Sequence, residues 1–357
     1  MKKQKLINFK KLYHRKTFWA GLLLAQFVLF FTFSKIPFFS VLFEHFFEFQ
    51  KTVHQKLFAD IPFSVGDVFY IFLILLFLFF IIKIINRKKR PVYLLKFLMV
   101  LNVIYFVYQI FWGMLYFQKP LLEKLPKKNI GLNEVKFLTL KYLEKCKKSR
   151  EFVSEDEHGV FVINDFRKVE TEVLAQQKKI PAFLSQKSST EIHSFKKSLF
   201  HNVISYSGIL GYYNPFTAEA QYNADLPDTY LPFTLAHESA HQLGFAREQE
   251  ANFVGYIIGK SSENLDLKYS TEYFVLKSLL NSLAEEHPEF VKSVIGNYSE
   301  GMKRDRNAEK LFIEKHAGLL DIFFGFTNDL FLKSNQQEGS ITYSYFIDLL
   351  LRYEDPK

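Results

Sequence analysis

The chain has 357 residues, a formal net charge of +9 and a single cysteine, Cys146, so an internal disulfide framework and a cysteine-based zinc site are both excluded. Its length allows two or three domains, and its 42 Phe are concentrated in the first third. Much of the positive charge flanks apolar segments, so we expect the lipid bilayer, and not nucleic acid, to be the partner of the basic residues.

The N-terminal third predicts a membrane domain. Residues 1–16 contain seven Lys or Arg and no acid, which predicts a basic cytoplasmic tail. Three apolar segments follow at about residues 17–34, 67–86 and 97–116, each long enough to span a bilayer as a helix. A cleaved signal peptide is the alternative for the first segment, but no small-x-small cleavage site follows it.

The segments between the spans predict the topology. Residues 37–65 alternate Phe and Leu with charged residues at helical spacing, which predicts an amphipathic extracytoplasmic loop on the membrane surface or against the later domain. The basic loop at residues 86–90 belongs on the cytoplasmic side, as does the N-terminus. Residues 17–117 are then predicted to form a membrane domain. Residues 118–357 are predicted to lie outside the cytoplasm.

The C-terminal 240 residues have ordinary polarity and predict one sizeable core. A stretch rich in β formers and turn residues at 211–223 predicts a hairpin, in which Glu219 and Asn223 could line a substrate cleft. An ordinary structural hairpin is the alternative for both residues. Helical patterns predict helices at 133–148, 161–177, 251–260, 272–286, 289–304, 308–332 and 339–352.

The most specific motif is His237-Glu238-x-x-His241, the HExxH pattern of zinc metallopeptidases. Four residues apart on a helix, His237 and His241 lie on one face, so both imidazoles can reach one ion. Glu238 is rotated about 100° from His237 and lies beside the ion, where it can take a proton from metal-activated water. The alternative is a pair of histidines on an ordinary surface helix.

A zinc site also needs a third protein ligand. Arg247 occupies the position of the last histidine in the metzincin pattern HExxHxxGxxH, and a guanidinium does not bind zinc. The following residues resemble the ExxA(D/N) segment of gluzincins, in which the first Glu is the third ligand. This resemblance implies Glu248 as the ligand and Asn252 as a side chain that orients a ligand. Glu250 and a residue distant in sequence are the alternatives.

The spacing between the motif and Glu248 predicts a turn. On a straight helix Glu248 would lie about 10 Å along the axis from His241, which is too far to share an ion. The chain is therefore predicted to turn at Gly244 and to begin a second helix near Ala246. In the C-terminal helix, Tyr345 could donate a hydrogen bond to a tetrahedral intermediate, and a core tyrosine is the alternative.

Taken with these motifs, the whole chain resembles an uncharacterised family of bacterial three-span membrane proteins with a gluzincin-like HExxH domain. The resemblance implies a mostly α fold, in which three transmembrane helices precede an α+β zincin-like domain with a small sheet and a long helical C-terminal part. It also implies Zn²⁺ as the cofactor. The residues that carry it are Pro62-Phe-Ser-Val-Gly-Asp67, Trp112-Gly113, Pro215-Phe-Thr-Ala-Glu-Ala220, residues 231–253 and Ser344-Tyr345.

The expected function is therefore a membrane-anchored zinc metallopeptidase that hydrolyses a peptide or protein substrate outside the cytoplasm. Two alternatives remain at this stage. One is a zinc-containing membrane sensor or assembly protein without turnover, and the other is an amidase that acts on a cell-wall peptide with the same chemistry.

Overall fold

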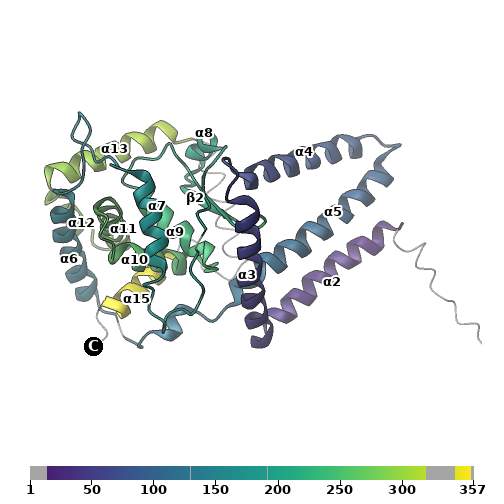
Figure 1. Ribbon diagram of the computed structural model, residues 1–357, viewed down its shortest axis with the longest axis horizontal. Coiled ribbons are helices and arrows are strands. Elements are labelled where there is room, and N and C mark those ends of the chain that lie inside the picture. The colour runs from purple at the N-terminus through teal and green to yellow at the C-terminus, as the bar shows by residue number, and fades with distance from the viewer. Residues whose placement is uncertain (1–13, 129, 191, 319–341, 355–357) are drawn as a thin grey trace, which may run out of the picture. The chain divides into compact units, whose positions relative to one another are not determined.

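The computed structural model describes residues 14–128, 130–190, 192–318 and 342–354 (Figure 1). The described chain is mostly helical, with one small three-stranded sheet. It divides into two compact units. The first comprises Met1–Gln50 and Val65–Gln118, and the second comprises Lys51–Ser64 and Lys119–Lys357.

The first unit contains three helices that are long and apolar enough to cross a membrane, namely α2 (Lys16–Ser34), α4 (Val65–Ile85) and α5 (Arg90–Phe111). The three predicted spans are therefore present as helices. The third begins earlier than predicted, because Pro91 stands in the first turn and the basic loop continues directly into the helix.

The helices of the first unit carry polar groups that are paired with one another. The Asn102 amide accepts a hydrogen bond from Gln26 Nε2 at 3.0 Å and donates to the Trp19 carbonyl at 3.0 Å. These bonds join α5 to α2. Polar side chains in an apolar environment pair with groups of neighbouring helices in this way.

The predicted amphipathic stretch forms α3 (Pro37–Phe58), whose C-terminal part belongs to the second unit with the loop that follows. Lys196 is buried against this loop, and its Nζ donates to the Ala59 carbonyl at 2.6 Å and also to the Ile61 carbonyl. A buried ammonium needs such acceptors, so these bonds hold the loop against the sheet. Residues 51–64 are thus part of the second unit, although the sequence predicted them as part of the membrane domain.

The sheet has the order β1–β3–β2, with β1 (Phe195–Lys197) parallel to β3 (Glu219–Tyr222) and β2 (Gly211–Asn214) antiparallel to it. The predicted hairpin is therefore formed by β2 and β3. Alternate residues of each strand face opposite sides of the sheet. Ala220 and Phe195 face the hydrophobic core, whereas Gln221 is hydrogen-bonded to the Ser64 hydroxyl at 3.0 Å on the other face.

The helices of the second unit enclose α9, which packs against α7, α10, α11 and the sheet (Figure 1). The helices of this unit in the described residues are α6 (Leu132–Arg150), α7 (Phe166–Gln177), α8 (His201–Ile204), α9 (Leu231–Gln242), α10 (Glu248–Lys260), α11 (Leu265–Leu283), α12 (Pro288–Gly296), α13 (Glu300–His316) and α15 (Thr342–Glu354), with short 3₁₀ turns at Leu121–Lys124 and Ser205–Ser207.

Capping residues move several helix ends from the predicted positions. Helix α11 begins at Leu265 and not at 272, because the Asn264 side chain accepts from Leu267 N at 2.9 Å and caps the helix. The helix predicted at 289–304 is two helices, since α12 ends at Gly296 and Ser299 caps α13.

Two other predicted helices are also shortened. Asp165 caps α7, so the helix predicted at 161–177 begins five residues later. The prediction at 308–332 is met as far as His316, where α13 ends, and residues 319–332 lie outside the described part of the chain.

Candidate metal centre

Helix α9 is buried along almost its whole length. Eleven of its 12 residues are buried, and the exception is His237, which is half-buried. Its polar side chains bind the surrounding elements, since Ser239 accepts from Gln177 Nε2 and Gln242 Nε2 donates to Ser194 Oγ at 2.6 Å. These bonds fix the rotation of the helix, so the motif side chains have defined directions.

The chain turns after α9 as the sequence predicted. Gly244 has φ +89°, in the left-handed region that favours glycine, and Phe245 N donates to the Ala240 carbonyl at 3.1 Å. Helix α10 begins at Glu248 and returns against α9. A second glycine permits this close packing, because a Cβ at Gly255 would lie 3.1 Å from His237 N.

The turn brings three side chains together. His237 Nε2 and His241 Nε2 lie 3.1 Å apart, and the Glu248 carboxylate oxygens lie 3.2 Å from the first and 3.5 Å from the second. This is the group in the described residues whose donor atoms could hold a metal ion, all within 4.8 Å of one another. The helix pair therefore places the predicted third ligand beside the two histidines.

The outer nitrogens of both imidazoles are fixed by oxygen acceptors. His237 Nδ1 lies 2.8 Å from Asn252 Oδ1, and His241 Nδ1 lies 2.6 Å from the Phe245 carbonyl oxygen. Because each oxygen accepts a hydrogen bond, each Nδ1 carries the proton and each Nε2 presents a lone pair to the shared space. Two lone pairs and a carboxylate so close together repel one another unless a cation lies between them.

A tetrahedral zinc ion fits this donor set. With metal–ligand bonds of about 2.0–2.1 Å, two tetrahedral ligands lie about 3.3 Å apart. The observed separations of 3.1, 3.2 and 3.5 Å match that spacing. Two imidazoles and one carboxylate are three protein ligands, so the fourth position of a tetrahedral ion held here would stay open.

The charges at the cluster respond to burial and to one another. Burial lowers the pKa of His241, but the Glu248 carboxylate outweighs this effect and holds the pKa at about 9. Burial raises the pKa of Glu248, and the two imidazoles reverse this and hold it well below its usual range. The cluster therefore favours a positive charge at its centre, whether a proton or a metal ion supplies it.

Glu238 differs from Glu248 in its surroundings. It is buried, and its Oε2 has no hydrogen-bond partner among the described residues. Burial raises the pKa of Glu238 to about 7, against the opposing effect of His237 and His241. A carboxylate with that pKa can accept a proton and release it again near neutral pH.

The comparison with known families identifies the family of the chain. Residues 43–351 match the family described as protein of unknown function (DUF3810). The chain belongs to this family. No curated protein and no solved structure matches the chain. The expected membership of an uncharacterised membrane protein family is thus confirmed, and any assignment of function rests on the site itself.

Glu250 and Tyr345, two further candidate site residues of this DUF3810 chain, lie near each other and are not part of the cluster of three candidate ligands. Glu250 Oε1 accepts from Leu121 N at 2.8 Å and from Arg247 Nη1 at 3.1 Å. Burial raises the pKa of Tyr345 to about 12, and the neighbouring Glu250 adds to this shift. Glu250, the alternative third ligand, is thus directed to the backbone before α6, and Tyr345 packs against the core beside it.

The two cleft candidates have structural surroundings. Glu219 pairs with Asn214 across the hairpin and faces the side of the sheet that carries Gln221 and Lys196, opposite to the side that faces the core and α9. The strand register favours the alternative of a structural hairpin for Glu219, and its place in a substrate cleft stays a prediction. Asn223 is buried and holds the turn after β3, with its Oδ1 accepting from Asp225 N at 3.1 Å.

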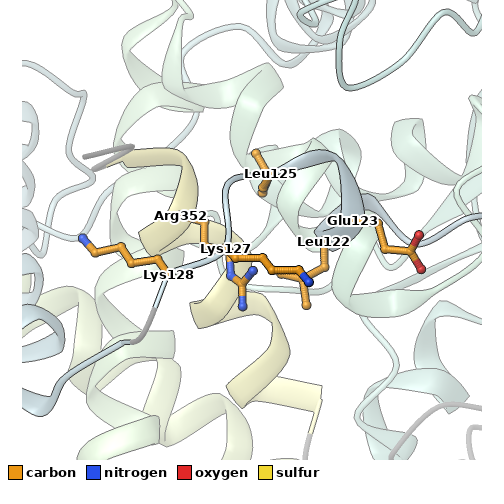
Figure 2. A pocket seen from close by; sticks show the side chains of 6 residues that line it. All are labelled: Leu122, Glu123, Leu125, Lys127, Lys128 and Arg352. Carbon is orange, nitrogen blue, oxygen red and sulfur yellow. The ribbon is translucent and has the colours of Figure 1, made fainter.

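A cavity of about 780 Å³ is also present in the second unit of this family member, separate from the three candidate ligands (Figure 2). Its positive charges are largely paired, because Arg352 binds Asp348 at 2.6 Å and Lys128 lies 3.0 Å from Glu134. The residues that line it are Leu122, Glu123, Leu125, Lys127, Lys128 and Arg352.

Proposed function

We propose that the protein is a membrane-anchored zinc metallopeptidase that hydrolyses peptide bonds outside the cytoplasm. The observation that carries this proposal is the convergence of His237 Nε2, His241 Nε2 and the Glu248 carboxylate next to the buried Glu238. A purely structural zinc site has four protein ligands and no use for a neighbouring carboxylate, whereas a hydrolytic site needs one as a base.

Each residue of the candidate metal centre would have its own role in the reaction. His237, His241 and Glu248 would hold the ion, with Asn252 and the Phe245 carbonyl keeping both Nε2 atoms directed at it. Bound zinc would supply Lewis acidity, polarising a substrate carbonyl and lowering the pKa of water. Glu238 would take the proton from the attacking water and pass it to the leaving amine.

The test of this proposal is the variant Glu238→Gln. Glutamine keeps the shape of the side chain but cannot take a proton, so hydrolysis of a peptide library should fall by about 10²–10⁴-fold. Zinc should remain at about one ion per chain, because Glu238 is not a ligand. Retained hydrolysis in this variant would contradict the peptidase. Zinc retention with an unchanged cellular phenotype would favour the alternative of a sensor or assembly protein.

The proposed location is the extracytoplasmic face of a bacterial inner membrane. The basic N-terminal tail and the loop at residues 86–90 would lie in the cytoplasm by the positive-inside rule. Three spans would then place the second unit outside. An alkaline phosphatase fused after Lys357 should therefore be active, and a green fluorescent protein at the same point should be dark. The reverse pattern would contradict this topology.

A further inference from the structure

We infer that the main chain of β2 at Gly211 sets the position of the Glu238 carboxylate, a role that rests on the proposed function of Glu238 as the base. Gly211 is thus a positioning residue: it leaves the space into which the carboxylate extends. No side chain at position 211 is compatible with the observed place of Glu238.

The evidence is the closeness of the two residues. A Cβ at Gly211 would lie 2.8 Å from Glu238 Oε1 and 2.9 Å from Glu238 Cγ. Both distances are shorter than any ordinary contact between such atoms. Glycine allows the backbone to approach the carboxylate directly, and any other residue would push it from its place.

The position of the Glu238 side chain depends on this packing contact, whereas hydrogen bonds orient the two histidines. His237 and His241 are each oriented by a bond from Nδ1. No side-chain hydrogen bond orients Glu238 in this way, and its buried Oε2 has no partner among the described residues. Its position is therefore fixed by packing, and the backbone of β2 at Gly211 lies directly against it.

Strand β2 is itself held in place at Gly211. Gly211 pairs with Tyr222 of β3 in the antiparallel hairpin, and the Cβ at position 211 would also lie 2.8 Å from the Gln221 carbonyl oxygen. An alanine at this position would strain the hairpin as well as displace Glu238. A test must therefore separate the strain against Gln221 from the contact with Glu238.

A double-mutant cycle makes this separation. The melting temperature is measured on the full-length protein in detergent for wild type, Gly211→Ala, Glu238→Ala and the double variant. The single cysteine, Cys146, is fully buried, so a thiol-reactive fluorophore reports its exposure on unfolding. The control Gly296→Ala places a Cβ where no atom beyond the neighbouring backbone of its own helix lies within 4 Å, and we expect no decrease in the melting temperature.

We expect Gly211→Ala to lower the melting temperature by about 3–10 °C in the wild type and by less than half of that in the Glu238→Ala background. An equal shift in both backgrounds would overturn the inference, because only the strain against Gln221 would then remain. If Gly211→Ala does not fold, recovery of folded protein in the double variant supports the inference, and no recovery overturns it.

Zinc content is measured on the same four proteins, so that failure of this inference can be told apart from failure of the proposed function. Wild type that binds no zinc would contradict the metallopeptidase, while the cycle would still report on the contact between Gly211 and Glu238. The converse result, zinc binding with an additive cycle, would leave the metallopeptidase in place and remove the positioning role of Gly211.

Discussion

Replacing Glu248 with alanine should remove zinc from the protein, whereas replacing Glu250 with glutamine should leave it bound. Glu248 supplies the carboxylate that lies 3.2 and 3.5 Å from the two imidazole nitrogens. Without it, two histidines remain, and we expect the affinity for zinc to fall by more than roughly 100-fold. The measurement is metal content by mass spectrometry on the detergent-purified protein, with about one zinc per chain in the wild type.

Glu250 is the matched control for this prediction. Both glutamates lie in the first turn of α10, but Glu250 is directed to Leu121 N and Arg247. Glutamine keeps the acceptor for Leu121 N, so the variant should fold and bind zinc. Zinc retained in Glu248→Ala but lost in Glu250→Gln would show that the other glutamate is the ligand. His241→Ala provides the second comparison, and it should lose zinc as Glu248→Ala does.

The sequence predicted the centre of this site because its signals are local. The spacing of His237 and His241 defines one helix face, and Gly244 predicts the turn that the structure contains. On a straight helix Glu248 would lie too far from His241 to share an ion. Helix α10 must therefore return against α9, and this brings Glu248 to the histidines. The three apolar spans were equally local, since each is defined by a single continuous segment.

The parts that the sequence did not predict depend on contacts between distant segments. Whether Glu219 faces α9 or the opposite side depends on strand register, and a shift of one residue reverses it. The contact of Gly211 with Glu238, and of Gly255 with His237, appears in the sequence only as two glycines in regular elements. Such glycines can indicate a close backbone approach, but they do not identify the partner.

The sequence left the assignment of residues 51–64 open between the membrane surface and the later domain for the same reason. Their spacing predicts an amphipathic helix, which is equally consistent with a membrane surface. The deciding contacts come from Lys196, which is distant in sequence and donates to the Ala59 and Ile61 carbonyls. A lysine in a basic sequence gives no indication that it will be buried.

The largest effect on stability is expected far from the candidate metal centre, at Asp305 of α13. Its carboxylate is fully buried and accepts from Arg150 Nε at 2.6 Å, Tyr269 Oη at 2.6 Å and Phe161 N at 2.9 Å. Asp305 thereby joins α13 to α6, to α11 and to the segment before α7. Asp305→Ala would remove the buried charge partner of the Arg150 guanidinium and leave it only the exposed carboxylate of Glu155, which lies 2.9 Å from Arg150 Nη1.

Breaking a buried ion pair by removing one member costs about 3–5 kcal/mol, far more than an exposed pair contributes. We therefore expect Asp305→Ala to lower the melting temperature by about 10 °C or more, measured through the exposure of Cys146. Glu300 on the same helix forms an exposed pair with Lys303, so Glu300→Ala should leave the melting temperature unchanged. An equal, small shift in both variants would contradict the role of Asp305.

Zinc content should stay at about one per chain in Asp305→Ala below its melting temperature, because Asp305 contributes to the stability of the fold and not to the ligand set.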